Sequence, residues 1–451
     1  MDNTFTILMS YLYHHYIKKI TAMCMDENEF QLMKNFCVDT YNELKNNNEG
    51  EVANYIPQLS NQDPSCFGIS VCDISGAQFS LGNANNPFCI QSCCKPFLYC
   101  LARKEHNMKK VHSHVGFEPS GRSFNAFTLN RLNLPHNPMI NAGAIMISSL
   151  IHTNREPSKR FDAVLQYLHT FGNAEHIGYD NSVYLSEQHH ADRNISLAYY
   201  MRENKAFSNS PSPSDIQNHL NLYFQACSVS INANIGARFA ATLANSGVSP
   251  FTKTEIVDQE TVKDCLSLMY SCGMYDFSGE FAFEVGLPAK SGVAGCILLV
   301  VPGKFGMCVW SPPLDQLGNS VRGVELCRRL ANYGPCNVHL FRRISDKSES
   351  NIDFMFYQLM SECNKGNVDK IRSIIQKTNI NRSDYDGRTP LHIAVADGHI
   401  DVCSLLLQHG AKTNLHDRWG KNALHGISML EDPIKKKMEI LFSVQKSRLV
   451  D

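Results

Sequence analysis

The sequence predicts a mixed α/β domain followed by a smaller domain of helical repeats. Two observations indicate the α/β domain. Strand-like segments occur near both ends of the stretch 51–340, and helix-like segments lie between them. A third observation is a short motif that recurs at a fixed period within residues 352–451. The chain has 451 residues, which suffices for two or three domains of ordinary size.

The composition is that of an ordinary globular protein. Lysine and arginine number 42 and aspartate and glutamate 43, so the formal net charge is −1, and 43% of the residues are hydrophobic. A neutral chain offers no electrostatic reason to expect nucleic acid or a membrane surface as a partner. The 27 glycines and 18 prolines follow no period, which argues against a fibrous build.

Each expected element follows from a local pattern. Residues 1–50 are expected to form a short N-terminal helical region, because apolar residues recur at helical intervals over 26–48. Residues 67–74 alternate as a strand does, and 296–301 and 306–310 form two apolar runs around the turn Pro302-Gly303. Helices are expected at 161–171 and 220–243, and an exposed loop at 208–215. We therefore expect a sheet that is assembled from both ends of the domain.

The C-terminal repeat has a recognisable sequence. Leu391-His392 and Leu424-His425 are 33 residues apart, and the first pair lies within Thr389-Pro-Leu-His-Ile-Ala394. This period and motif resemble a short ankyrin array, in which Thr-Pro begins a helix and the histidine forms a local hydrogen bond. A plain helical bundle is the alternative, but it does not require the repeated Leu-His.

The seventeen cysteines are read as buried thiols in a reducing compartment. None stand in C-x-x-C spacing, and the histidines form no H-E-x-x-H or paired Cys/His pattern, so no metal site is expected. The apolar run 5–13 lacks the flanks of an export signal, and the N-terminus lacks the character of a transit peptide. The stretch 293–302 is too short to span a bilayer. We expect an intracellular protein with no membrane partner.

Two short motifs can carry chemistry. Ser92 and Lys95 stand at i and i+3, which on a helix places the hydroxyl and the amine on one face. A desolvated lysine has a lowered pKa and can accept the serine proton. Lys290-Ser-Gly292 lies directly before the strand at 296, and the pair of motifs in this order is typical of serine β-lactamases and penicillin-binding proteins. A surface helix and a solvated hairpin edge are the alternatives.

Longer blocks resemble the glutaminase family. They are Tyr55-Ile-Pro-Gln-Leu59, Gln91-Ser-Cys-Cys-Lys-Pro96, Pro135-His-Asn-Pro-Met-Ile-Asn-Ala-Gly-Ala144, Asp192-Arg-Asn194, Ser271-Cys-Gly-Met-Tyr-Asp-Phe-Ser-Gly279 and Leu287-Pro-Ala-Lys-Ser-Gly-Val-Ala-Gly295. With the ankyrin tail, the chain is similar to the animal kidney-type and liver-type members. The resemblance implies a serine β-lactamase-like fold, an antiparallel sheet with a helical subdomain, that hydrolyses L-glutamine to L-glutamate and ammonia. It also implies a Ser-Lys acyl-enzyme, a homotetramer, a mitochondrial location and no metal or organic cofactor, with phosphate as a candidate activator.

The resemblance also implies roles for individual residues. Ser92 matches the nucleophile, Lys95 its base, and Tyr275 the tyrosine that relays a proton, while the amide of Val293 matches the second oxyanion donor. The residues that match the family's glutamine-binding positions are Tyr55, Asn141, Glu187, Asn194 and Tyr223. A carboxylate such as Glu187 suits an ammonium group, and amide and phenol donors suit a carboxylate. Turn, surface-helix and core roles are the alternatives for these residues.

Other functions stay open at this stage. One is a penicillin-interacting or other amidase of the same fold, and another is a catalytically silent scaffold whose ankyrin repeats bind a protein partner. The segment 121–129, with Phe124 and Phe127, lies where the family has a loop at the tetramer interface, but its details differ from the kidney-type pattern. Phosphate activation therefore does not transfer, and the cytoplasm remains an alternative to the mitochondrion.

Overall fold

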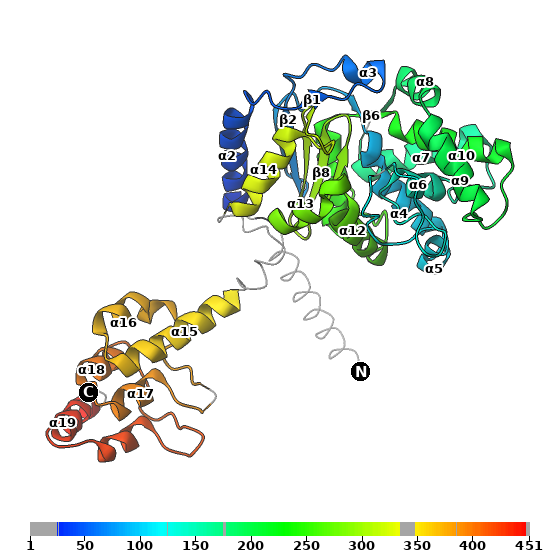
Figure 1. The fold of residues 1–451 in the computed structure, drawn as a ribbon. Helices are drawn as coiled ribbons and strands as arrows, with labels where there is room; N and C mark the ends of the chain where they lie inside the picture. The colour runs from blue at the N-terminus through cyan, green and yellow to red at the C-terminus, as the bar shows by residue number, and fades with distance from the viewer. Residues whose placement is uncertain are drawn as a thin grey trace, which may run out of the picture. The chain divides into compact units, whose positions relative to one another are not determined.

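The computed structural model describes residues 25, 27–123, 125–174, 177–333, 348–384 and 386–447. The chain divides into two compact units, one up to Leu340 and one from Phe341 onward (Figure 1). Each unit has hydrophobic clusters of its own. Most of the N-terminal region that we expected at 1–50 lies outside the described residues or forms one helix, α2 (Glu27–Leu44). Residues 1–24, the stretch around 340 and the last four residues are outside the description.

A five-stranded antiparallel sheet forms the centre of the first unit. Its order is β3-β2-β9-β8-β7. Strands β2 (Gly68–Asp73) and β3 (Gln78–Gly82) come from one end of the unit, and β7 (Ala289–Gly292), β8 (Cys296–Val301) and β9 (Phe305–Trp310) come from the other. Gly68 pairs with Trp310 where the two groups of strands meet. The expectation that both ends of the domain build one sheet is confirmed.

Both faces of this sheet are covered, which explains why β2, β8 and β9 are buried along their whole length. Alternate residues of β8 belong to different cores. Ile297 and Leu299 pack with α2 and α14 (Val321–Asn332), whereas Leu298 and Val300 pack with α11 (Ala233–Ala244). In Figure 1 the helices α2 and α14 lie beside the sheet, away from the helical part of the unit.

The helical subdomain joins the α11 side and carries most of the site. Its main helices are α4 (Lys95–Glu105), α6 (Asn141–Ser148), α7 (Pro157–Gly172), α8 (Asn181–His189), α9 (Asp192–Glu203), α10 (Pro213–Cys227) and α12 (Gln259–Cys272). Shorter elements are α3 (Pro57–Ser60), α5 (Met108–His112), α13 (Ser278–Glu284), the pair β1 (Glu51–Val52) and β10 (Pro313–Leu314), and the small sheet β4 (Phe88–Cys89), β6 (Val229–Ile231) and β5 (Gly178–Tyr179).

Two local expectations are wrong. The helix expected over 220–243 is broken, because β6 separates α10 from α11 and Asn232 caps the second helix by accepting from the Ile235 amide. The loop expected over 208–215 ends early, because Ser212 and Asp215 form a capping box and Pro213 begins α10. In both places a capping residue starts a helix at a position that the surrounding sequence pattern did not predict.

The second unit consists of stacked helices. They are α15 (Ser348–Lys365), α16 (Val368–Ile374), the 3-10 turn η4 (Ile375–Lys377), α17 (Pro390–Ala396), α18 (Ile400–Gln408), the 3-10 helix η5 (Ala423–Met429) and α19 (Ile434–Ser447). The Thr389 hydroxyl lies 2.9 Å from His392 Nδ1 and Pro390 begins α17, as the ankyrin motif predicts. At the second Leu-His pair Asn422 replaces threonine, no proline follows, and the segment is a 3-10 helix.

Candidate functional site

Ser92 and Lys95 lie at the junction of two helices. The 3-10 helix η1 (Gln91–Cys94) runs directly into α4, whose first residue is Lys95. The Lys95 Nζ donates to the Ser92 hydroxyl at 3.0 Å. Ser92 is 7% exposed and Lys95 1%. The alternative of a surface helix is therefore wrong, and the pair can share a proton.

Burial sets the charge of Lys95. Desolvation lowers the pKa of its amine from the usual 10.5 to about 8. The Nζ also donates to Asn141 Oδ1 at 2.8 Å. At pH 7 about a tenth of Lys95 is thus the neutral amine, the form that can accept a proton, and this share rises with pH.

A second buried lysine lies beneath Tyr275. The Lys290 Nζ is 4.7 Å from the centre of the Tyr275 ring and donates to the carbonyl oxygens of Gly273, at 3.1 Å, and Ser291, at 2.7 Å. Burial lowers the pKa of Lys290 to about 7, and the Lys95 charge acts in the same direction. Lys290 belongs to β7 and is fully buried, so it is not a solvated hairpin edge.

Tyr275 is held in an unusual backbone conformation. Its φ is +54°, in the left-handed region that side chains other than glycine rarely adopt. Burial raises the pKa of its phenol, and a hydrogen bond with Ser92 acts in the opposite direction. The phenol therefore stays protonated and lies next to the Ser92 hydroxyl.

A cavity of about 350 Å³ opens over Ser92. Seven of the residues predicted for the site line it, and Lys95 and Tyr275 are not among its lining residues although both interact with Ser92. The predicted lining residues are Tyr55, Ser92, Asn141, Glu187, Asn194, Tyr223 and Val293. Residues from distant parts of the chain are thus brought around one serine.

One side of the cavity is acidic. The Tyr55 hydroxyl donates to Glu187 Oε1 at 2.6 Å, and Gln91 Nε2 donates to the same oxygen at 3.0 Å. Burial raises the pKa of Glu187, whereas these two hydrogen bonds lower it. The Glu187 carboxylate thus has two donors that orient it, and it lies at the cavity wall where it can bind a cation.

Another part of the wall consists of amides and a phenol. The Tyr223 hydroxyl donates to Asn141 Oδ1 at 3.2 Å, and Asn141 Nδ2 donates to Asn194 Oδ1 at 3.0 Å. Asn141 is the first residue of α6, and Asn194 lies in the first turn of α9, where helix N-termini favour negative charge. This part of the wall can bind a carboxylate.

Val293 reaches the cavity because β7 ends beside η1. The Cys93 Sγ donates to the Lys290 carbonyl at 3.2 Å. A Cβ on Gly292 would lie only 3.1 Å from both Cys93 Sγ and the Ile90 carbonyl, so the two backbones approach closely. Glycine at 292 permits this approach, and Val293, the next residue, lies at the cavity wall together with Ser92.

Five further residues line the cavity without a role predicted from the sequence, namely Gln91, Asn125, His190, Arg193 and Cys227. Gln91 and Arg193 lie inside blocks that carried the family resemblance, so adjacency to Ser92 and Asn194 was the available signal. The φ of +49° at Gln91 could not be predicted from the sequence, because glutamine rarely adopts a left-handed backbone conformation. Phe127 stacks with Arg193 at 4.7 Å, whereas Phe124 lies outside the described residues.

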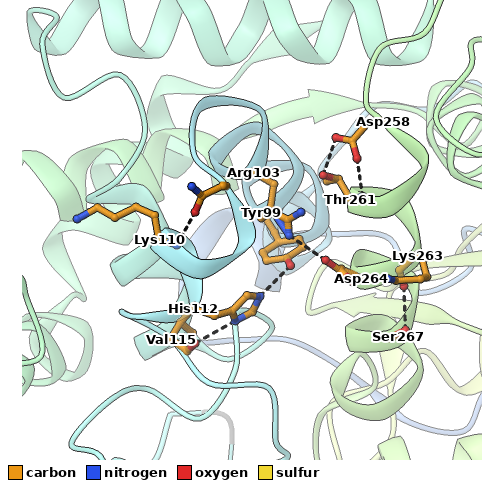
Figure 2. A network of polar contacts seen from close by, with 11 residues as sticks. Tyr99, Arg103, Lys110, His112, Val115, Asp258, Thr261, Lys263, Asp264 and Ser267 are labelled. Carbon is orange, nitrogen blue, oxygen red and sulfur yellow. Dashed lines mark hydrogen bonds and ion pairs between the residues drawn. The ribbon is translucent and has the colours of Figure 1, made fainter.

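A partly buried polar network anchors the helix that begins at Lys95 (Figure 2). Arg103 of α4 forms an ion pair with Asp264 of α12 at 2.8 Å. The Tyr99 hydroxyl lies 2.9 Å from His112 Nε2, and His112 Nδ1 lies 3.0 Å from the Val115 carbonyl. These contacts join α4 to two neighbouring segments and so restrict the position of Lys95.

Two further observations concern metal ions and membranes. Within the described ranges, no group of three or more His, Cys, Asp or Glu side chains is placed to hold a metal ion. None of the helices in that part of the chain is long and apolar enough to cross a membrane.

Comparisons with known proteins show the family of the chain. The glutaminase family model matches residues 50–341, and a model of three ankyrin repeats matches 358–428. The liver isoform of mitochondrial glutaminase from Rattus norvegicus is 42% identical over 403 residues, which cover 85% of this chain and 66% of the rat protein. A glutaminase from Nostoc is 42% identical over 67% of this chain and 88% of its own length. This chain thus spans about two thirds of the rat relative's length.

Solved structures share the fold. A structure described as the probable glutaminase ybaS has a TM-score of 0.65 and 30% identity, and the match covers 70% of this chain and 99% of that one. A structure of Mglu in its tris and glutamate form has a TM-score of 0.62 and 34% identity over 68% of this chain and 67% of that one. With its buried serine–lysine pair at the start of α4, its β-lactamase-like fold and its ankyrin repeats, this chain belongs to the glutaminase family.

Proposed function

We propose that this chain hydrolyses the side-chain amide of free L-glutamine to L-glutamate and ammonia. One observation carries the proposal: a serine that is hydrogen-bonded to a lysine of lowered pKa lies in a small cavity. The wall of this cavity has a carboxylate on one side and a separate group of amide side chains on another. Free glutamine carries an ammonium and a carboxylate on one carbon and a reactive amide at the other end. A cavity of about 350 Å³ accommodates a molecule of this size.

The acidic part and the amide part of the cavity wall each bind one charged group of the substrate. Glu187, oriented by Tyr55 and Gln91, binds the α-ammonium group. Asn141, Asn194 and Tyr223 bind the α-carboxylate, and the side-chain amide then points toward Ser92. An amide without both charged groups loses one of these contacts, so the wall selects a free amino acid.

Acylation begins when neutral Lys95 accepts the Ser92 proton and the oxygen attacks the amide carbon. The backbone amides of Ser92 and Val293 stabilise the oxyanion. Tyr275 relays a proton to the departing nitrogen, and the C–N bond breaks to release ammonia. Water then attacks the γ-glutamyl ester as Lys95 accepts one of its protons, and that proton passes to the Ser92 oxygen, with Tyr275 as the relay, when the C–O bond breaks and L-glutamate leaves. Lys95 and Tyr275 carry every proton transfer and the two backbone amides stabilise the oxyanion, so the proposed cycle uses no metal or organic cofactor.

The decisive test measures glutamate and ammonia release from L-glutamine by purified protein. Ser92→Ala is expected to lower kcat by at least a thousandfold, because it removes the group that forms the acyl-enzyme. Ser267→Ala, on the exposed face of α12, is the matched control and should retain activity within twofold. Equal activity of Ser92→Ala and the parent would contradict the mechanism.

Assembly and location extend the proposal. We infer a homotetramer whose ankyrin repeats offer a surface for a protein partner, and phosphate is only a candidate activator. A rat relative is named mitochondrial, which supports that organelle for this chain, with the cytoplasm as the alternative. Light scattering with and without phosphate tests the assembly, and cell fractionation tests the location. A monomer at all phosphate concentrations would contradict the tetramer.

A further inference from the structure

Two thiols meet beside the reaction centre. The Cys94 Sγ lies 4.0 Å from the Cys227 Sγ, although the residues are 133 positions apart. Cys94 stands between Ser92 and Lys95 and ends η1, and Cys227 ends α10. Both are free thiols and buried, 1% and 3% exposed.

The two thiols differ in access. Cys227 lines the cavity over Ser92, one helical turn beyond Tyr223, whereas Cys94 is not among the lining residues. A small molecule that enters the cavity therefore meets Cys227 first and finds Cys94 directly behind it. This order suits a pair in which one sulfur reacts with an oxidant and the second resolves the product.

A second close pair provides a comparison. The sulfurs of Cys296 and Cys308, on β8 and β9, are 3.7 Å apart. Both residues are fully buried in the sheet, and neither is among the residues that line the cavity. The sulfur–sulfur distances of the two pairs are similar, so the pair Cys94–Cys227 differs from the pair Cys296–Cys308 in its access to the cavity.

We propose that Cys94 and Cys227 form a peroxide-sensitive dithiol site that closes to a disulfide and switches the enzyme off. Deprotonated Cys227 attacks one oxygen of hydrogen peroxide, the O–O bond breaks, and the departing hydroxide takes up the released proton as water. Cys94 then attacks the resulting sulfenic sulfur, the S–S bond forms, and the S–O bond breaks. The Cys94 proton leaves with that oxygen as a second water. The thiols lose two electrons and the peroxide gains them.

Bond formation must move the reaction centre. A disulfide has an S–S length of about 2.05 Å, so sulfurs now 4.0 Å apart must approach by roughly 2 Å. Cys94 shares its short helix with Ser92 and precedes Lys95 directly. A displacement of about 1 Å at a catalytic group can lower the rate about a hundredfold. We expect at least a tenfold loss of activity in the oxidised form.

The surroundings set the rate of oxidation. Hydrogen bonding with Cys94 and burial raise the pKa of the Cys227 thiol, and the Lys95 charge opposes them. Because the thiolate is the reactive form, oxidation is slow at neutral pH and accelerates as the pH rises.

The test uses the full chain, reduced and then treated with hydrogen peroxide. Non-reducing peptide mass spectrometry should detect Cys94 linked to Cys227, and glutamine hydrolysis should fall at least tenfold and recover with dithiothreitol. The activity measurement rests on the proposed function, whereas the linked peptide does not, so the two can fail separately. Absence of the linked peptide, while other thiols become oxidised, would overturn the proposal.

Two variants, each compared with its own untreated sample, sharpen the result. Cys94→Val removes the resolving thiol, and its dithiothreitol-reversible loss should be less than twofold. Cys308→Ala breaks the comparison pair and should respond to peroxide as the parent does. If Cys94→Val still shows the full reversible loss, the site is wrong. If Cys94→Val does not fold, the linked peptide in the parent chain decides the question.

Discussion

Burial gives single residues their chemistry in this protein. Lys95 is an ordinary lysine in the sequence, but complete desolvation lowers its pKa to about 8. Gln91 and Tyr275 both have left-handed φ values, +49° and +54°, and both contact the reaction centre. Such conformations cost of order 1–3 kcal/mol each and persist where the surrounding structure imposes them. The sequence places these residues near Ser92 only by adjacency or by family likeness.

The pH dependence of kcat/KM should follow the protonation of the Lys95 amine. The amine is charged below its pKa and neutral above it, and only the neutral form accepts the Ser92 proton. We expect kcat/KM to rise about tenfold per pH unit below pH 8 and to level off above it, since the pKa is about 8. Lys159→Ala, an exposed lysine, should leave the profile unchanged. A rise centred near 10.5 would show that burial does not lower the pKa of Lys95, and a profile without any rise would show that Lys95 is not the base.

Glu187→Gln should weaken glutamine binding. The substitution keeps the shape of the side chain but removes the charge that pairs with the α-ammonium group. A charge-assisted hydrogen bond contributes about 1.5–3 kcal/mol, so kcat/KM should fall roughly 10- to 100-fold, chiefly through a higher KM. Gln188→Ala is the control, because Gln188 bonds to Tyr184 and Asn221 and is not a cavity-lining residue. An unchanged KM in Glu187→Gln would refute the assigned role.

At the scale of elements, the position of α4 decides the geometry of the site. Its first residue is Lys95, and its last turn is joined to α12 through Arg103 and Asp264. The i, i+3 spacing of Ser92 and Lys95 predicted their contact correctly, because 3-10 and α turns both bring such residues together. The break between α10 and α11 was not predicted, because apolar residues continue through β6.

Arg103→Met should destabilise the first unit. The substitution leaves the Asp264 carboxylate, whose side chain is 20% exposed, without its main partner, although Lys263 remains 3.4 Å away. We expect a loss of roughly 2–3 kcal/mol in the free energy of unfolding, measured by urea denaturation. Lys159→Met breaks an exposed pair with Asp162 and should cost less than about 0.5 kcal/mol. Equal changes in the free energy of unfolding for the two substitutions would show that the Arg103–Asp264 pair contributes no more to stability than an exposed pair.

At the scale of the whole molecule, the chain carries separate hydrophobic cores. The clusters on the two faces of the sheet involve residues before 334, and the cluster of the ankyrin repeats involves residues after 358. The 33-residue period identified the repeats, and the two strand-like ends identified the sheet. Both patterns arise from residues that are close together in the sequence, so they can be recognised without knowledge of the tertiary contacts.

The two units should fold independently. A chain ending at residue 345 contains the cavity and both cores of the sheet, so we expect cooperative unfolding and glutamine hydrolysis within twofold of the full chain. Residues 346–451 alone should give a helical circular dichroism spectrum. Gel filtration of the full and shortened chains then tests whether the repeats take part in assembly. An insoluble or unfolded shorter chain would contradict independent folding.

The sequence by itself determined the fold class, the serine–lysine pair and the helical repeats, because each depends on spacing along the chain. Only the tertiary structure decided which side chains share the cavity, how Gln91 and Tyr55 orient Glu187, and that Lys95 and Lys290 are fully desolvated. It alone brought Cys94 to within 4.0 Å of Cys227. The physical reason is that burial and long-range contact depend on every packed element at once, whereas periodicity and motif spacing are local.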